Sequence, residues 1–158
     1  NDNMLSFQIF ISQLAGQTVM VITLLLIACV LLIKGYKQDF YIIGATTLLA
    51  MFTSSLLKLT LHIPRPEHML IEEDGYRFPS GHATMASVVM CLGMYYAHEH
   101  IKNVYLRNIT CISLVAWYIL VSYSRLYLHV HYPIDVIVGG LIGIITAILV
   151  IRQSKHHF

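Results

Sequence analysis

Charge is scarce in this chain: Asp, Glu, Lys and Arg together make up 11% of its 158 residues. Soluble globular domains carry roughly 25% of such residues, whereas 57% of this chain is hydrophobic and its mean hydropathy is +0.69. These values exclude an ordinary soluble domain and indicate a polytopic integral membrane protein. The net charge of only +2 gives no sign of a nucleic-acid partner, and we expect none.

Cysteine is also rare, and the chain lacks the features that would divide it into domains. The three cysteines have neither paired nor metal-ligand spacing, so we interpret them as small buried hydrophobic residues. They are Cys29, Cys91 and Cys111. There is no internal repeat, low-complexity tract or Pro/Gly/Ser linker, and nothing resembles a cleavable signal peptide. We therefore predict a single integral membrane domain over residues 1–158.

Long apolar runs fill most of the sequence. In lipid, backbone amides must be hydrogen-bonded within their own segment, and a span needs about 20 residues, so each run predicts a helix. The five runs cover roughly residues 17–33, 40–61, 80–97, 104–123 and 134–151. The expected fold class is all-α, a polytopic membrane helical bundle. Residues 1–16 are expected to form either an interfacial lead-in or the remnant of an upstream span.

Basic residues are distributed unevenly between the two ends of the predicted helices. Alternating spans place most loop cations on one side, which the positive-inside rule makes cytoplasmic. These cations are Lys34, Lys37, Lys102, Arg107, Arg152 and Lys155. The remaining cations lie on the opposite side, together with the unusual polar motifs. This distribution predicts a site at the outer face of a bacterial cytoplasmic membrane, facing the periplasm or the exterior.

One unusual motif is FPSGHA, at the predicted start of the third span. Ser80 is a suitable N-cap, and Gly81 lets a ligand approach the backbone. The unpaired N–H groups and partial positive charge of a helix N-terminus form a ready anion site, and His82 would lie beside it. An ordinary capped helix with an interfacial histidine is the alternative interpretation.

Another motif, KLTLHIPRP, places two cations at the end of the second span. Lys58 interrupts an apolar run, where it either snorkels towards water or serves a site. Arg65 lies between two prolines, and such a stiff segment suits a fixed contact. Further along the same loop, the acidic run 72–74 is interpreted as a solvated turn. Arg77 either helps to bind an anion or pairs with that turn.

The motif SRLYLHVHYPID joins the fourth and fifth spans. Pro133 favours the first turn of a helix, so Asp135 would lie near a helix N-terminus. His131 and Asp135 are four positions apart, and on a helical turn the carboxylate can accept a hydrogen bond from one ring nitrogen. The other nitrogen is then free to attack, as in other pairs of a base and its orienting group. His129 lacks this spacing and is interpreted as an interfacial side chain.

Small residues in the last span predict a close helix contact. The segment GGLIG places Gly139 and Gly143 one turn apart, the pattern that lets membrane helices approach each other. The alternative is that glycine is simply common in membrane helices.

The polar residues of these motifs fit phosphoryl transfer. Its transition state spreads negative charge over three equatorial oxygens, so catalysis depends on positioning and on stabilisation by cations and N–H groups. One histidine can attack phosphorus in line, and the other can protonate the leaving oxygen. No cluster of carboxylates suitable for Mg²⁺ is evident in the sequence.

Together the motifs resemble the three signatures of the type 2 phosphatidic acid phosphatase and vanadium haloperoxidase superfamily. The matches are K-x6-RP (58–66), PSGH (79–82) and SR-x5-H-x3-D (124–135), complete and in order. Membrane members of this family usually have six spans, with the first signature after the third. Here that signature follows the second predicted span, so the resemblance implies a sixth span upstream that this chain does not contain.

The resemblance implies a metal-free phosphatase that needs no cofactor and forms a phosphohistidine intermediate. Carried over to this sequence, His131 is the expected nucleophile, Asp135 its orienter and His82 the general acid. The residues expected to hold the phosphate are Lys58, Arg65, Ser80, Gly81 and Arg125. The short polar loops leave no soluble substrate-binding domain, so we expect a lipid phosphate or pyrophosphate as substrate. Examples are undecaprenyl pyrophosphate, phosphatidylglycerophosphate and phosphatidate.

Other functions remain open on the sequence alone. A lipid phosphotransferase would use the same scaffold, with an acceptor lipid intercepting the phosphohistidine. A metal-dependent hydrolase could use His82, His129 and His131 as ligands, although no further ligand shell is evident. A non-enzymatic transporter would line a pathway with the polar cluster, although that cluster lies at the membrane edge and not in mid-span.

Overall fold

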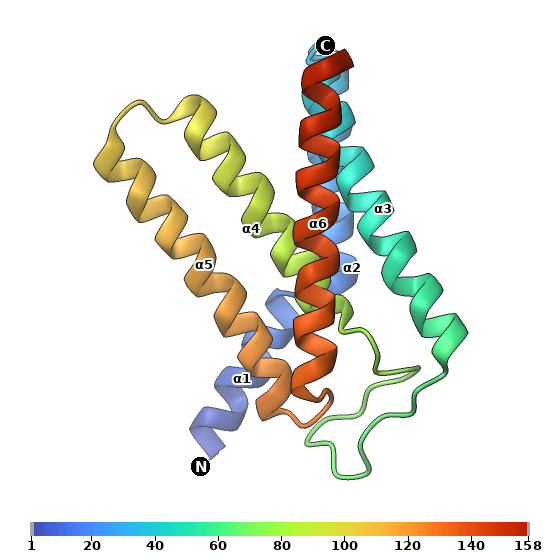
Figure 1. Ribbon diagram of the computed structural model, residues 1–158. Helices are drawn as coiled ribbons and strands as arrows, with labels where there is room; N and C mark the ends of the chain where they lie inside the picture. The colour runs from blue at the N-terminus through green and yellow to red at the C-terminus, as the bar shows by residue number, and fades with distance from the viewer. Residues whose placement is uncertain (1, 158) are drawn as a thin grey trace.

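The computed structural model describes residues 2–157, and over that range it contains helices and no strands (Figure 1). The helices are α1 (Asp2–Leu14), α2 (Gln17–Ile33), α3 (Lys37–Leu61), α4 (Gly81–His100), α5 (Val104–Tyr127) and α6 (Pro133–His157). The predicted all-α class is confirmed, and each predicted apolar run corresponds to one helix from α2 to α6. The stretch 1–16, predicted as a lead-in or a span remnant, contains α1.

Local sequence explains where several helices begin and end. Asn103 caps α5, because its Oδ1 accepts a 3.0 Å hydrogen bond from the Tyr105 N–H, as a good N-cap does. The connection from α2 to α3 passes through Gly35, whose φ of +86° favours glycine. The helix α6 begins at Pro133, as predicted from the preference of proline for the first helical turn.

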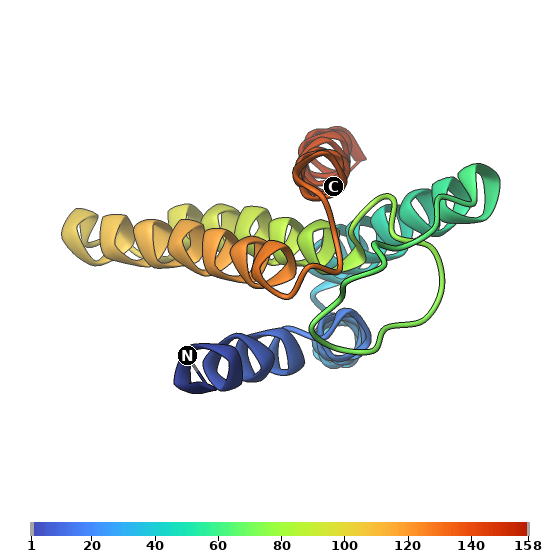
Figure 2. The ribbon, with the colours of Figure 1, turned by 90° about the horizontal axis from the view of Figure 1, so that it is seen from below.

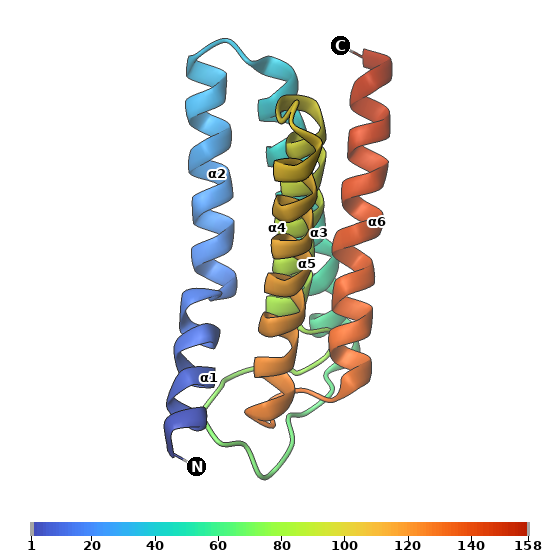
Figure 3. The same cartoon turned by 90° about the vertical axis from the view of Figure 1, so that its left-hand side faces the viewer.

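The helices form three layers, which are visible from below and from the side (Figures 2 and 3). α3, α4 and α5 lie in a middle row, with α6 on one side of it and α1 followed by α2 on the other. α4 contacts α2, α3, α5 and α6, while α1 packs against α5. α4 is therefore surrounded mainly by other helices, whereas the outer helices have a face left for lipid.

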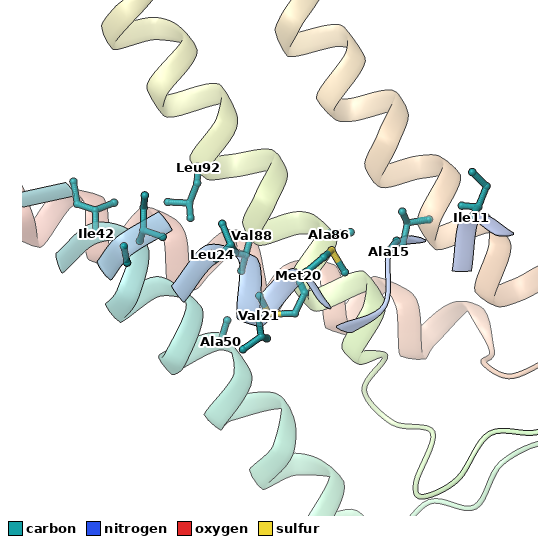
Figure 4. Close-up of a cluster of buried hydrophobic side chains, with 14 residues drawn as sticks. Ile11, Ala15, Met20, Val21, Leu24, Ile42, Ala50, Ala86, Val88 and Leu92 are labelled. Atoms are coloured by element: carbon teal, nitrogen blue, oxygen red, sulfur yellow. The ribbon is translucent and has the colours of Figure 1, made fainter. Parts of the chain in front are cut away.

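The main hydrophobic core lies between α2, α3 and α4 (Figure 4). Its buried side chains include Met20, Val21, Leu24, Ile42, Ala50, Val88 and Leu92. Large apolar side chains also lie on the outside of the bundle. Leu26 of α2, Phe52 of α3 and Ile112 of α5 are 61%, 64% and 69% exposed, which suits a surface that contacts lipid.

Within the described residues, four helical stretches are long and apolar enough to cross a membrane. They are Asp2–Ile33, Lys37–Leu61, Val104–Tyr127 and Pro133–His156. The sequence analysis predicted five spans, and the difference is α4. Half of its 20 residues are buried, among them the small or polar side chains of Thr84 and Ser87. Because α4 faces other helices, its hydropathy is lower than lipid contact would require.

Glycines bring α6 close to α4, as the GGLIG segment predicted. A Cβ atom on Gly143 would lie 2.0 Å from Ser87 Oγ and 2.5 Å from Thr84 O. A Cβ atom on Gly139 would lie 2.5 Å from Ser80 O. Side chains cannot occupy such short separations from backbone oxygens, so this helix contact requires glycine and the predicted close contact is confirmed.

The connections between helices separate into two ends of the bundle (Figure 1). The α3–α4 loop and the α5–α6 junction lie at one end, which we call the loop end. The α2–α3 and α4–α5 connections lie at the other end with the C-terminus. The six cations that were assigned to the cytoplasmic side therefore belong to the end opposite the polar motifs.

The cysteines are less buried than the sequence analysis predicted. Cys29 is exposed on α2, while Cys91 and Cys111 are partly exposed, and all three are free. The helices that carry them turn one face outward, and in a membrane protein an apolar residue need not be inside the protein to avoid water. Hydropathy alone therefore could not predict their burial.

Candidate active site

The sequence motifs converge at the loop end of the bundle. Lys58 lies in the last turn of α3 and Arg125 in the last turn of α5, while His82 and Asp135 lie in the first turns of α4 and α6. From α2 to α6, successive helices run in alternating directions (Figure 3), so these helix ends meet although they are far apart in sequence. The predicted meeting of the motifs is therefore observed.

The Ser80–Gly81 turn is bound directly to the third motif. Ser80 N donates a 2.9 Å hydrogen bond to the Asp135 carbonyl oxygen, and Ser80 Oγ accepts a long 3.5 Å hydrogen bond from Ala83 N. This confirms Ser80 as the N-cap of α4. A Cβ atom at Gly81 would lie 1.7 Å from Gln17 Oε1, so the start of α2 closes over this turn.

His131 and Asp135 form the pair that their spacing predicted. His131 Nδ1 faces Asp135 Oδ2 at 3.5 Å, but the predicted hydrogen bond is not formed, because Nδ1 has no hydrogen-bond partner among the described residues; such contacts are often loose without substrate. The same carboxylate oxygen accepts a 2.8 Å hydrogen bond from Tyr132 N. His131 is 4% exposed and Asp135 0%, whereas His129 is exposed. Because Nδ1 faces the carboxylate, Nε2 is the ring nitrogen of His131 that remains for chemistry.

Burial determines the charge of His131. Desolvation lowers the pKa of its imidazole, the contact with Asp135 raises it, and Arg125, Arg65 and Lys58 lower it again. The pKa of His131 therefore lies below its ordinary value of 6.5, because burial and nearby positive charge both disfavour the charged form. The ring is neutral at pH 7, which is the form that a nucleophile requires.

Arg77 has a partner that the sequence analysis did not identify. Its Nη1 forms an ion pair with Asp135 Oδ1, and its guanidinium lies 4.7 Å from the centre of the Tyr132 ring. The prediction had been an anion or the acidic run 72–74 as its partner. Both oxygens of Asp135 are thus engaged, and the ion pair favours the ionised form of the carboxylate.

Two predicted cations are held by backbone carbonyls of the α3–α4 loop. Lys58 Nζ donates a 2.7 Å hydrogen bond to Tyr76 O. Arg65 donates through Nη2 to Asp74 O at 2.9 Å and through Nη1 to Val130 O at 3.2 Å. Arg65 therefore joins the α3–α4 loop to the α5–α6 junction, and both cations are fixed close to the His131–Asp135 pair.

Arg125 is fully buried and connects three parts of the chain. Its Nη1 donates to Ser12 Oγ of α1, and its Nη2 forms an ion pair with Glu73. Its Nε has no hydrogen-bond partner among the described residues, so one buried donor is left for a ligand. Ser12 thereby makes α1 a wall of the site, a role that no sequence pattern in residues 1–16 indicated.

Glu73 is not part of a solvated turn, and that prediction is wrong. Its Oε2 lies 3.0 Å from Arg65 Nη2, its Oε1 pairs with Arg125, and its side chain is 23% exposed. Burial alone would raise the pKa of the Glu73 carboxyl, but Arg125, His82 and Arg65 more than offset this and lower it. The neighbouring Glu72 is exposed, so only the middle member of the acidic run turns inward.

The two candidate catalytic histidines line separate cavities. His131 lines one together with Pro66, Leu126 and His129. His82 lines another together with Ser12, Gln13, Ile71 and Glu73. Glu73, which lines the His82 cavity, pairs there with the guanidinium groups of Arg65 and Arg125.

The chemistry of this arrangement is that of an anion cradle beside a nucleophile. Two arginines, one lysine and the N-terminus of α4 supply positive charge and donors, and His131 presents a neutral ring nitrogen. Among the described residues, no group of three or more His, Cys, Asp or Glu side chains could hold a metal ion. The roles of the individual residues remain predictions.

The sequence and the fold both resemble known membrane phosphatases. Residues 39–158 match the sequence profile of the PAP2 superfamily, which confirms the resemblance seen in the motifs. Phosphatidylglycerophosphatase B of Haemophilus influenzae is 30% identical over 76 residues, covering 48% of this chain and 32% of that protein. Phosphatidylglycerophosphatase B of Bacillus subtilis is 31% identical over 100 residues, covering 61% and 49%. The matches thus span half or less of these relatives.

Solved structures extend the resemblance to almost the whole chain. A transmembrane PAP2-type phosphatidylglycerolphosphate phosphatase from Bacillus subtilis superimposes with a TM-score of 0.78 over 99% of this chain and 79% of that one, at 23% identity. LpxE from Aquifex aeolicus gives 0.68 over 96% and 87%, at 25% identity. The first likeness is evidence for the fold alone. Together with the apolar helices, these matches identify an integral membrane protein.

Proposed function

This chain belongs to the PAP2 superfamily, and on that premise we propose that it is a membrane phosphatase acting on a lipid phosphate or pyrophosphate. The observation that carries the proposal is the convergence of Lys58, Arg65 and Arg125 around the buried His131–Asp135 pair. Such a cradle stabilises the charge that develops on the equatorial oxygens during phosphoryl transfer.

The proposed reaction has two steps. His131 Nε2 attacks phosphorus, the bond from phosphorus to the leaving oxygen breaks, and His82 donates a proton to that oxygen. Water then attacks phosphorus, the bond between phosphorus and His131 Nε2 breaks, and His82 accepts a proton from the water, which releases inorganic phosphate and restores both rings. Asp135 orients His131 and stabilises its positive charge during the attack.

A lipid substrate is supported by an apolar groove beside the His82 cavity. The groove is lined by Leu14, Val19, Met20, Thr23, Leu24, Ile27, Val89 and Trp117. Leu14 follows Gln13, which lines the His82 cavity, so both hollows reach the region of the α1–α2 bend. A lipid could place its chain in the groove and its phosphate towards His82. Phosphatidylglycerophosphate is the first candidate because of the relatives' names, followed by undecaprenyl pyrophosphate and phosphatidate.

The test of this function is a panel assay on the purified full-length protein. Release of inorganic phosphate would be measured from these three lipids in detergent, with His131→Ala as the control for contaminating phosphatases. We expect release from at least one lipid and none from the variant. Equal release by both proteins, or none from any lipid, would contradict the proposal. Mass spectrometry of the lipid products separates hydrolysis from transfer, because a phosphotransferase yields a newly phosphorylated lipid.

We further propose that the site faces outward, because the six cations named above lie at the opposite end of the bundle. A cysteine at Asp74, in a variant lacking the three native cysteines, should react with a membrane-impermeant maleimide in intact spheroplasts. A cysteine at Lys102, which is exposed at the other end, should react only after the membrane is opened. The reverse order of labelling would place the site on the cytoplasmic side.

A further inference from the structure

The carboxylate of Glu73 lies where the proposed reaction needs the phosphate. Its two oxygens contact different guanidinium groups, Oε2 with Arg65 at 3.0 Å and Oε1 with Arg125. These arginines come from the α3–α4 loop and from α5, and both match phosphate-binding positions of the family signatures. A carboxylate bridging two arginines makes the same charge-assisted contacts that two phosphate oxygens would make.

The chain around Glu73 holds it in this position. Asp74 and Gly75, the residues that follow it, present their carbonyl oxygens to Arg65 at 2.9 and 3.1 Å. The next carbonyl, that of Tyr76, accepts the hydrogen bond from Lys58. The same cations that would bind a phosphate therefore bind the segment 73–76 in the free protein.

Binding of substrate requires this arrangement to open. An incoming phosphate cannot bridge the two guanidinium groups while Glu73, which lines the His82 cavity, occupies that position. The Glu73 side chain retains a 23% exposed surface, so rotation towards solvent can release it. The Nε donor of Arg125 that lacks a partner shows that the carboxylate does not use the whole binding capacity of the cradle.

We propose that Glu73 is an internal competitor, which occupies the phosphate subsite of the free protein and must be displaced by the phosphate of the substrate. The proposal rests on the proposed function for the identity of the substrate, but not for the occupancy of the cradle. Glu73 then determines the affinity for phosphate without taking part in the chemical steps. It would also speed product exchange, since its return to the arginines displaces inorganic phosphate.

The competition has a quantitative signature. If the cradle is free of Glu73 for about a tenth of the time, every phosphate-like ligand binds about 10-fold more weakly than to an open cradle, because apparent affinity scales with the competent fraction. Removing the charge of Glu73 should therefore lower the KM for the lipid and the Kd for orthovanadate by the same factor. A residue that merely positions the arginines would give the opposite result, since its loss would weaken both.

The experiment compares Glu73→Gln with the wild type and with Glu99→Gln, which removes the same charge at an exposed position near the other end of α4. Binding of orthovanadate and inorganic phosphate to the full-length protein in detergent is measured by calorimetry, and kcat and KM are measured on the lipid that proves active. We expect about 10-fold tighter binding and an equally lower KM for Glu73→Gln, with Glu99→Gln unchanged. Unchanged or weaker vanadate binding by folded Glu73→Gln would overturn the proposal.

Two further results distinguish a failure of this inference from a failure of the proposed function. If Glu73→Gln does not fold, Glu73→Asp retracts the carboxylate by one methylene and should shift the vanadate Kd in the same direction by less. An increase in Kd would again overturn the inference. If the wild type releases phosphate from no lipid while Glu73→Gln still binds vanadate more tightly, the proposed function fails and the internal competitor stands.

Discussion

Gly139 offers the sharpest test of how the fold supports the chemistry. It lies on α6, one turn after Asp135, at the point where α6 touches the start of α4. A Cβ atom there would lie 2.5 Å from the carbonyl oxygen of Ser80, about 0.9 Å inside the 3.4 Å limit of ordinary contact. That carbonyl cannot easily move, because it accepts hydrogen bonds from Thr84 N at 3.0 Å and from Thr84 Oγ1 at 2.9 Å.

Gly139→Ala should therefore push α6 away from α4 by most of an ångström. The hydrogen bond from Ser80 N to Asp135 O, 2.9 Å long, joins the Ser80–Gly81 turn to the His131–Asp135 pair, and it lies across the same contact. A misplacement of about 1 Å in an active site can cost roughly 10²-fold in rate. Overpacking of this kind typically costs about 1–3 kcal/mol of stability. We expect a roughly 10²-fold lower kcat together with a lower melting temperature.

The measurement is phosphate release from the active lipid, with thermal unfolding in the same detergent. Gly44→Ala is the matched control, because a Cβ atom at Gly44 on α3 meets nothing within 4 Å and alanine favours a helix by about 1 kcal/mol over glycine. That variant should keep its activity and unfold at the same or a higher temperature. If Gly139→Ala keeps wild-type kcat while the control behaves as expected, the close contact does not hold the two motifs in register.

The remaining predictions concern the histidines and the phosphate cradle. His131→Ala should abolish turnover, whereas His129→Ala should keep most of it because that side chain is exposed; the reverse result would reassign the nucleophile. Because the pKa of His131 is lowered, its ring is still neutral at pH 6.5, so the acidic limb of kcat/KM, corrected for substrate ionisation, should have its midpoint below 6.5. A midpoint above 6.5 would contradict the burial argument. Vanadate should compete with substrate and EDTA should have no effect, so activity lost to EDTA and restored by Zn²⁺ or Mg²⁺ would favour a metal-dependent hydrolase.

The helices could be predicted because their signals are local. The run predicted over 17–33 coincides with α2 (Gln17–Ile33), and the run from 104 begins where α5 begins. The last span was predicted over 134–151 and extends over Pro133–His157, because polar residues continue a helix after its apolar part ends. Hydropathy locates the part of a helix that lies in lipid, and caps and turns determine its actual ends.

The convergence of the motif residues could be predicted because each lies at a helix end or in the loop beside it, with a chemical reason for its type. The interaction partners of these residues could not be predicted, because the interactions join segments that are distant in sequence. Glu73 reaches Arg125 and Ser12 reaches the same guanidinium from α1, and neither residue lies in a periodic pattern. Charge alone made the acidic run 72–74 resemble a solvated turn, since nothing local distinguishes Glu73 from the exposed Glu72.

The moderate polarity of α4 has two consequences. It keeps the hydropathy of the helix below that of the candidate spans, and it accompanies the close contact with α6. Thr84 and Ser87 lower its hydropathy, yet they lie where Gly139 and Gly143 bring α6 into contact. A helix of large apolar residues would have the hydropathy of a membrane span, but its side chains would hold α6 farther away. The Ser80 turn could then no longer reach the backbone of Asp135, which lies on α6. The half-buried and moderately polar sequence of α4 is therefore what allows the Ser80 turn and the His131–Asp135 pair to lie together at the loop end.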